Sequence, residues 1–282
     1  MILGIDAGNY KAKTVGEYGV DNFHTNICEW FKRNIKESFG ADDMEFVIDG
    51  QRGFAGLLAK HEDEFGGSMY GDSKAHQDTK TRVLLAIYRY MNKYQIHNDR
   101  FSIVVGQPFS KHTTEEKNVI KGMLSGHHEY VVNGDHLSIS IDNIEVATEG
   151  GSAYWINQAK GLARYIDIGS GTVNAITVLN GKIINSSSET FNFGTETVKN
   201  KSLAALANGI IRNTSQLNWK REDAVFLGGG VAEIIKPLIC QYYMNAQVLD
   251  TSEHPMYVNA TGFYEIAKRL YSNNTTRNVV AR

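Results

Sequence analysis

The chain carries one short pattern twice, once at its start and once in its second half. GIDAGNYKAK begins at Gly4, and YIDIGSGTVNA begins at Tyr165. Each copy joins an apolar stretch to Asp-x-Gly and a turn, and a second apolar stretch follows, which predicts a strand, a tight turn and a returning strand. Two copies of one unit that face each other form a cleft with a turn on either side. The repeat therefore predicts two related halves around a binding site.

The turns of the repeat have the composition of a phosphate site. Gly8 in the first turn lets backbone N–H groups approach a ligand, because glycine has no Cβ, and such groups bind phosphate oxygens. Asp6 and Asp167 repel phosphate, so we expect a divalent cation, Mg²⁺ held largely through water, between carboxylate and phosphate. Taken alone, Asp6 is more typical of a turn-capping aspartate. The repeat favours the functional interpretation.

Further groups for a nucleotide come from three places. Lys13, on the strand that returns from the first turn, offers a positive charge to phosphates. The amides and hydroxyls of the second turn come from Gly169, Ser170, Gly171 and Thr172. A third glycine segment follows the apolar AVFL and consists of Gly228, Gly229 and Gly230. In isolation it is equally typical of a tight strand-to-helix turn, but after two Asp-Gly turns it is predicted to support a base and a sugar.

The rest of the chain has the pattern of an α/β protein. Thr79–Tyr94 places apolar residues at helical spacing, and 101–108 is a continuous apolar run typical of a buried strand. Thr113–Gly126 has a capped start and a glycine stop, which predicts a second helix. Another helix is expected to begin near Gly150. The stretch from Cys28 to Tyr70 has no clear pattern.

Composition describes an ordered protein. The residues are 42% hydrophobic and 21% charged, and a length of 282 suits two modest domains or one large one. No apolar run approaches the roughly 20 residues that cross a bilayer, and no signal-peptide pattern is present, so we expect a cytoplasmic protein without membrane contact. Cys28 and Cys240 are predicted to be free buried thiols. The net charge of −2 gives no general attraction to DNA, so direct DNA binding is not expected.

Taken in order, these motifs resemble the actin, Hsp70 and sugar-kinase superfamily of ATPases, and especially the bacterial actin-like plasmid-segregation proteins of the ParM type. GIDAGNYKAK, with its lysine seven positions after the aspartate, is similar to the first phosphate loop, and YIDIGSGTVNA is similar to the second. VATEGGSAYW resembles the connecting segment with the catalytic acid, FGTETV the second connecting segment, and VFLGGGVAEII the adenosine motif. The ending PMYVNATGFYEIA also resembles that of the ParM group.

The resemblance implies a role for each matching residue. Asp6 and Asp167 would organise Mg²⁺ and its waters, as part of the catalytic machinery, and Lys13 would contact the β- and γ-phosphates. Glu149 would orient the attacking water, which a carboxylate can do. An acid in the first turn of its helix is the alternative interpretation of Glu149. Further contacts to a nucleotide, ATP or GTP, are implied for Gly8, Asn9, Tyr10, Lys11, Gly194 and Thr195.

The implied fold is α/β, namely the actin-like ATPase fold with two related RNase H-like domains around a nucleotide cleft. The first domain is expected at residues 1–149, with an inserted subdomain at about 23–95, and a shortened second domain at 150–282. ParM-type proteins and actin insert a small subdomain, IIB, between the second phosphate loop and the adenosine motif. Here Gly194–Gly228 holds little beyond one helix. This shortening resembles the AlfA type, which lacks the subdomain.

The implied function is a filament that moves or segregates plasmid DNA. Subunits would add head to tail, and hydrolysis in the cleft would weaken the contact between them. A DNA-binding adaptor protein at a plasmid centromere site is the expected link to DNA.

Two other functions fit the same motifs less well. A small-metabolite kinase of the same superfamily, similar to pantothenate kinase, needs an aspartate base beside the acceptor hydroxyl. Asp99 and Asp142 lie in turn contexts and are interpreted as surface residues. A nucleotide sensor or chaperone-like module is the third alternative, but no residues remain for a peptide-binding domain.

Overall fold

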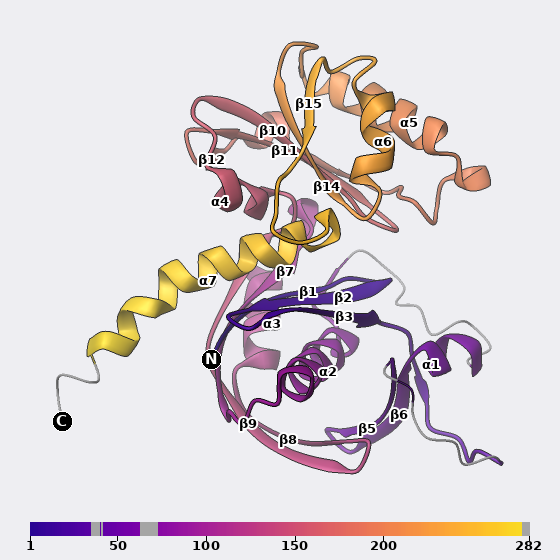
Figure 1. Ribbon diagram of the computed structural model, residues 1–282, viewed down its shortest axis with the longest axis vertical. Helices are drawn as coiled ribbons and strands as arrows, with labels where there is room; N and C mark the ends of the chain where they lie inside the picture. The colour runs from indigo at the N-terminus through magenta and orange to yellow at the C-terminus, as the bar shows by residue number, and fades with distance from the viewer. Residues whose placement is uncertain (35–39, 41, 63–72, 278–282) are drawn as a thin grey trace.

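The computed structural model describes residues 1–34, 40, 42–62 and 73–277, and its strands form two β-sheets. Strands from residues 2–148 form a nine-stranded sheet, and the six strands from residues 162–248 form a second sheet. Figure 1 shows the two sheets in separate halves, with the start of helix α7 (Val258–Arg277) between them. This mixed α/β architecture is the fold class that the sequence predicts.

The first sheet is built around the opening unit of the repeat. β1 pairs antiparallel with β2 and parallel with β7, and β7 pairs parallel with β9. β1 and β7 are buried along most of their length, as their continuous apolar runs predict. The spatial order is β3-β2-β1-β7-β9-β8-β5-β6-β4. The strands are β1 (Ile2–Ala7), β2 (Lys11–Gly16), β3 (Gly19–His24), β4 (Ile27–Glu29), β5 (Asp43–Ile48), β6 (Gln51–Gly56), β7 (Arg100–Gln107), β8 (Gly126–Val132) and β9 (Asp135–Thr148).

The second sheet repeats the pairing of the first. β10 pairs antiparallel with β11 and parallel with β14, just as β1 does with β2 and β7. The order is β12-β11-β10-β14-β15, and β13 pairs with β11. The repeat in the sequence is therefore a repeat of topology. The strands are β10 (Leu162–Ile168), β11 (Val173–Leu179), β12 (Lys182–Ile183), β13 (Glu189–Phe191), β14 (Ala224–Gly229) and β15 (Asn245–Val248).

Helix α2 occupies the concave side of the first sheet, which curves around it in Figure 1. The predicted apolar stripe faces that sheet, and Val83, Ile87 and Tyr90 are fully buried in the largest core cluster. His76 caps the helix by accepting a hydrogen bond from the N–H of Asp78. The helices are α1 (Leu57–Glu62), α2 (Gln77–Tyr94), α3 (Thr114–Leu124), α4 (Tyr154–Asn157), α5 (Leu203–Gln216), α6 (Ala232–Ile239) and α7.

Helix α7 joins the two halves because glycines allow close backbone approach. It packs on β1 and β7, and a Cβ added to Gly4 would collide with the backbone of Ala260 and Tyr264. On its other side, a Cβ on Gly262 would collide with the backbone of Ser152. The C-terminal segment thus contacts both the first sheet and the segment that follows it.

The prediction of a helix from Gly150 is correct only in part. Gly150 has a φ of 73°, which favours glycine, and is followed by a 3-10 turn (Gly151–Ala153) and the four-residue α4. Residues 192–223, all of which the structure describes, hold one 3-10 turn (Lys199–Lys201) and α5. They contain no strand, so the small subdomain of the second half is absent, as predicted.

Two other sequence predictions concern the whole chain. In the part that the structure describes, no helix combines the length and the apolar character that a membrane span requires. Cys28 and Cys240 form no disulfide, as predicted, but only Cys28 is buried, whereas Cys240 is half-buried.

Candidate functional site

A cleft of about 400 Å³ is lined by residues of both halves, and its size falls in the range of roughly 300–1,000 Å³ that is typical of small-molecule sites. Among the predicted site residues, only Gly194 and Gly228 lie outside its lining. Those that line it are Asp6, Gly8, Asn9, Tyr10, Lys11, Lys13, Glu149, Asp167, Gly169, Ser170, Gly171, Thr172, Thr195, Gly229 and Gly230.

The first turn brings Asp6 and Lys13 together because they are partners across β1 and β2. Lys13 Nζ donates to Oδ2 of Asp6 at 3.0 Å. Burial is the largest effect and lowers the pKa of Lys13, but the charge and hydrogen bond of Asp6, together with the charges of Asp167 and Glu149, raise the pKa overall. A Cβ on Gly8 would lie 2.6 Å from the carbonyl oxygen of Lys11, so this tight turn requires glycine. The result is a lysine that is charged at neutral pH beside the first turn.

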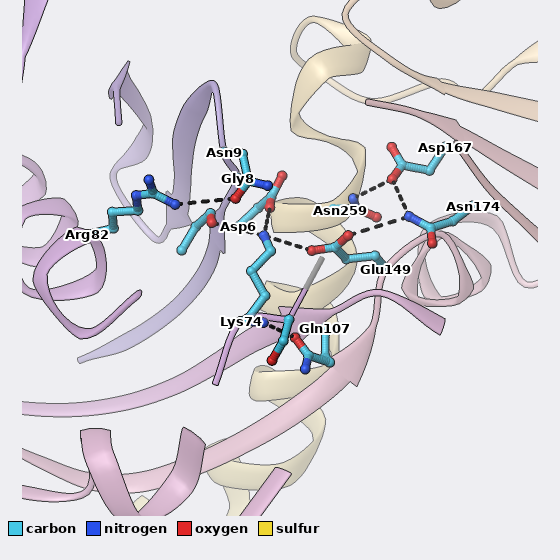
Figure 2. Close-up of polar contacts among 12 residues, drawn as sticks. Asp6, Gly8, Asn9, Lys74, Arg82, Gln107, Glu149, Asp167, Asn174 and Asn259 are labelled. Atoms are coloured by element: carbon cyan, nitrogen blue, oxygen red, sulfur yellow. Dashed lines mark hydrogen bonds and ion pairs between the residues drawn. The ribbon is translucent and has the colours of Figure 1, made fainter. Parts of the chain in front are cut away.

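The rest of the first turn is tied to neighbouring elements. Thr25, after β3, donates from Oγ1 to the carbonyl of Gly8 at 2.8 Å, and its N–H donates to the carbonyl of Tyr10. Arg82 of α2 donates to Oδ1 of Asn9 at 3.3 Å, as Figure 2 shows. Nζ of Lys11 donates a hydrogen bond to Oδ1 of Asn22 on β3 at 3.3 Å. These bonds fix the backbone that is predicted to approach phosphates.

The second turn repeats this geometry with asparagines in place of the lysine. Asp167 on β10 is the partner of Asn174 on β11, the position that corresponds to Lys13. Oδ2 of Asp167 accepts from Asn174 at 3.3 Å and from Asn259 of α7 at 3.0 Å. Burial raises the pKa of Asp167, and the charge of Asp6 raises it further. A buried carboxylate of this kind favours a nearby cation.

Gly194 and Gly228 shape the cleft from behind its lining. A Cβ on Gly194 would lie 2.5 Å from the carbonyl oxygens of Gly169 and Ser170, so the second connecting segment packs directly on the second turn. The N–H of Thr195 donates to the carbonyl of Gly169 at 3.1 Å. A Cβ on Gly228 would meet Val258 of α7 at 2.9 Å. Both glycines therefore support the cleft through packing.

The last two glycines of the third segment differ in their surroundings. Gly229 ends β14 with a φ of 103°, and a Cβ there would collide with the carbonyl of Ile168. Gly230 has open space around its Cα. The turn therefore needs Gly229 for its backbone, whereas Gly230 borders the free volume of the cleft.

Glu149 lies between the two turns and follows β9 directly. Its N–H donates to the carbonyl of Gln107, at the end of β7, over 2.9 Å. Oε2 accepts from Asn174 at 3.4 Å, and Oε1 lies 3.0 Å from Nζ of Lys74. Burial raises the pKa of Glu149, and Lys74 offsets this only in part. Gly150, which follows Glu149, has a positive φ and leads into a 3-10 turn. Glu149 is therefore not in the first turn of a regular α-helix.

Sequence reasoning missed several residues of the cleft. Lys74 precedes α2, in a polar stretch with no chemical motif, and no sequence signal points to it. Asn259, inside PMYVNATGFYEIA, lines the cleft, and Asn174, inside YIDIGSGTVNA, lies outside the lining and donates to Asp167 and Glu149. An asparagine in either motif carries no chemical signal of its own. The other missed lining residues are Pro108, Ile168, Glu196, Val231, His254 and Met256.

The arrangement gathers buried acids and lysines in one cleft. Asp6, Glu149 and Asp167 are between 5% and 9% exposed, and Figure 2 shows Lys74 and Asn174 linking them into one network. Such a site favours a ligand that carries both negative and positive charge. Asp99 and Asp142 do not line this cleft, and Asp142 pairs with Arg100 at 2.8 Å.

Comparisons with known proteins agree with this architecture. Residues 4–151 match a family model described as the actin-like proteins N-terminal domain. Curated proteins give no match. An AlfA filament bound to AMPPNP is 20% identical, with a TM-score of 0.77, over 100% of this chain and 99% of that chain. A filament of AlfA from the B. subtilis plasmid pLS32 is 21% identical, with a TM-score of 0.79, over 93% and 97%.

A third solved structure, the archaeal actin homologue Ta0583, is 18% identical, with a TM-score of 0.74, over 95% of this chain and 99% of that chain. At these identities the likeness shows a shared fold. The family model covers residues 4–151 of 282, and the two related halves close around a cleft with paired Asp-Gly turns. The chain therefore belongs to the family of actin-like proteins.

Proposed function

We propose that this chain binds a magnesium nucleoside triphosphate, ATP or GTP, in the cleft and hydrolyses it. Hydrolysis would control a head-to-tail filament that moves or segregates plasmid DNA in the cytoplasm. The observation that carries the proposal is the equivalence of the two turns. Asp6 is the strand partner of Lys13 in the first turn, and Asp167 is the strand partner of Asn174 in the second. Asp6 and Asp167 line the same cleft.

The phosphates would lie between the two turns. Lys13 is held at the cleft by Asp6 and offers its charge to the β- and γ-phosphates. Gly8 and residues 169–172 offer backbone amides from opposite sides, without side chains in the way at the glycines. The base and sugar would rest against Gly229 and Gly230. The charge of Lys13 and the backbone amides of the two turns would thus bind the same phosphates.

A magnesium ion fits the donors that are present. Among the described residues, no three His, Cys, Asp or Glu side chains are placed to hold a metal together. Asp6 and Asp167 would therefore hold the ion through its waters and the phosphates, as Mg²⁺ prefers. The ion would neutralise charge on the transferred phosphoryl group.

Glu149 would orient the attacking water. Its Oε1 is buried and lies 3.0 Å from the ammonium of Lys74, and its Oε2 accepts a hydrogen bond from Asn174. A carboxylate has about four lone-pair sites, so these two contacts leave it able to accept a further hydrogen bond. The carboxylate would therefore accept a hydrogen bond from a water placed in line with the terminal phosphate.

Filament formation is proposed from the likeness to the two AlfA filaments, which shows the fold. In the proposed subunit, the first domain ends at residue 149 and the second begins at residue 150. Helix α7 of the second domain packs on strands of the first. The partners would be further copies of this chain and a DNA-binding adaptor at a plasmid centromere site. We favour this function over a metabolite kinase because the candidate bases Asp99 and Asp142 lie outside the cleft.

The test combines assembly with turnover. Purified protein is mixed with ATP or GTP, with and without Mg²⁺, and followed by light scattering, electron microscopy and phosphate release. Scattering should rise above a critical concentration and filaments should appear. Asp167→Ala should abolish magnesium-dependent phosphate release, whereas the matched surface variant Asp99→Ala should behave like the unchanged protein.

The same experiment has outcomes that contradict the proposal. Absence of assembly with either nucleotide over a range of salt concentrations would argue against the filament. Phosphate transfer to a small acceptor such as pantothenate would favour the kinase. Full turnover in Asp167→Ala would remove this aspartate from the metal site.

A further inference from the structure

Lys74 is a buried lysine that belongs to no motif of the sequence. It lies in the short segment before α2, and its side chain is 6% exposed. We propose that Lys74 is a positioning residue for hydrolysis, which acts by holding the carboxylate of Glu149 in place and aimed into the cleft. This inference rests on the proposed function.

The contacts of Lys74 bridge the first turn and the connecting segment. Its Nζ donates to the carbonyl of Ala7 at 2.9 Å and lies 3.0 Å from Oε1 of Glu149. The same nitrogen is 4.0 Å from Oδ1 of Asp6. Figure 2 shows the ammonium between these two acids. One cation therefore sets the distance between the metal-facing turn and the carboxylate that is to hold water.

The backbone of Lys74 is fixed as firmly as its side chain. Its N–H donates to Oε1 of Gln107, a fully buried residue at the end of β7, over 2.9 Å. Gln107 and Ser73 both donate to Oε2 of Glu116 on α3, at 2.9 and 2.6 Å. A surface lysine moves its charge through many rotamers, but this one is anchored at both ends. It is therefore suited to hold another group in place.

The charge of Lys74 matters because three acids share the cleft. Lys13 pairs with Asp6, and Asp167 is held by asparagines, so Lys74 is the cation in contact with Glu149 among the described residues. An ionised carboxylate only accepts hydrogen bonds, which is the state needed to orient a water. Removing the ammonium would leave a buried carboxylate without a counter-charge.

A competing role for Lys74 is a direct contact to phosphate, since it also lines the cleft. The two roles make different predictions. A phosphate ligand contributes to nucleotide affinity whatever residue stands at position 149. A positioning residue contributes to the rate and only while the carboxylate of Glu149 is present.

The experiment is a double-mutant cycle with Lys74→Met, Glu149→Gln and the combined variant. Lys121→Met, which removes a lysine ion-paired to Glu145 at 2.7 Å outside the cleft, is the control. Single-turnover phosphate release and nucleotide Kd are measured with Mg²⁺ and ATP or GTP. Thermal unfolding of the nucleotide-free proteins gives a second readout that does not depend on turnover.

Lys74→Met should slow phosphate release by about 10-fold to 100-fold and change Kd by less than about threefold. In the Glu149→Gln background the same substitution should change the rate by less than about twofold. Without nucleotide, Lys74→Met should lower Tm by about 5 °C or more, and the combined variant should recover part of the loss. If Lys74→Met fails to fold, a folded combined variant gives the same evidence of coupling.

Other results would overturn the proposal. Equal rate losses in both backgrounds, or additive losses in Tm, would show that Lys74 does not act through Glu149. A loss confined to Kd would make Lys74 a phosphate ligand. Absence of turnover in the unchanged protein would overturn the proposed function and the role of Lys74 with it, whereas normal turnover with additive losses would overturn the role of Lys74 alone.

Discussion

Asn259 donates a hydrogen bond from Nδ2 to Oδ2 of Asp167 over 3.0 Å, although the two residues are 92 positions apart. The other side of the same carboxamide accepts from the N–H of Gly150 at 2.9 Å. Asn259 lies at the start of α7 and is 5% exposed. The last helix therefore fixes the second turn and the connecting segment relative to each other.

Asn259→Ala should reduce both turnover and stability, because it leaves the Asp167 carboxylate and the Gly150 N–H without this partner. We expect a loss of about 1–3 kcal/mol in the free energy of unfolding and about 10-fold to 100-fold in phosphate release. Urea unfolding and a phosphate assay measure the two effects. Asn245→Ala, which removes a hydrogen bond to Glu222 on the surface, is the control. Normal turnover in Asn259→Ala would contradict the role.

The sequence predicted the parts of the site that are local and failed for the parts that packing brings in. Asp6 and Gly8 form one turn, and Asp167 and Gly169 form another, so short motifs reveal them. Lys74 reaches the site only because Gln107 and Glu116 anchor its segment, which no local pattern encodes.

Asn259 escaped prediction for the same reason. It enters the site because Gly4 and Gly262 let α7 pack closely on both halves. The sequence shows both glycines, but it does not show which distant segments pack against them.

Glu149→Gln should uncouple nucleotide binding from hydrolysis, because the amide keeps the shape of the side chain and loses the charge that orients water. We expect phosphate release to fall by about 100-fold or more, while nucleotide affinity and assembly persist. Stopped-flow phosphate detection and sedimentation measure the two. Glu129→Gln on β8, a residue that does not line the cleft, is the matched control. Unchanged release would remove Glu149 from its proposed role.

Asp167→Asn should stabilise the nucleotide-free protein at neutral and alkaline pH. Burial and the charge of Asp6 raise the pKa of Asp167 above its usual value of 3.8, so the folded state binds this proton more tightly than the unfolded chain does. The stabilisation by that proton is complete below the unfolded pKa and is lost as the pH rises through the folded pKa.

The neutral side chain removes this loss, so the gain should be about 1 kcal/mol or more near about pH 8 and should vanish near about pH 4. Thermal unfolding across this range, without Mg²⁺ or nucleotide, measures it. The same variant should lose magnesium-dependent turnover. A gain that is equal at both ends of the range would contradict the assigned cause.

Gly229 and Gly230 provide a matched pair that separates backbone need from ligand space. Alanine at position 229 meets a φ of 103° and the carbonyl of Ile168, so it should lower the free energy of unfolding by about 2 kcal/mol or more. Alanine at position 230 meets nothing within 4 Å and should lower the free energy of unfolding by no more than about 0.5 kcal/mol.

Because Gly230 lines the cleft, Gly230→Leu should keep the fold and weaken nucleotide binding by about tenfold. Fluorescent-nucleotide titration and urea unfolding distinguish the two effects, and unaltered affinity in Gly230→Leu would place the base and sugar elsewhere.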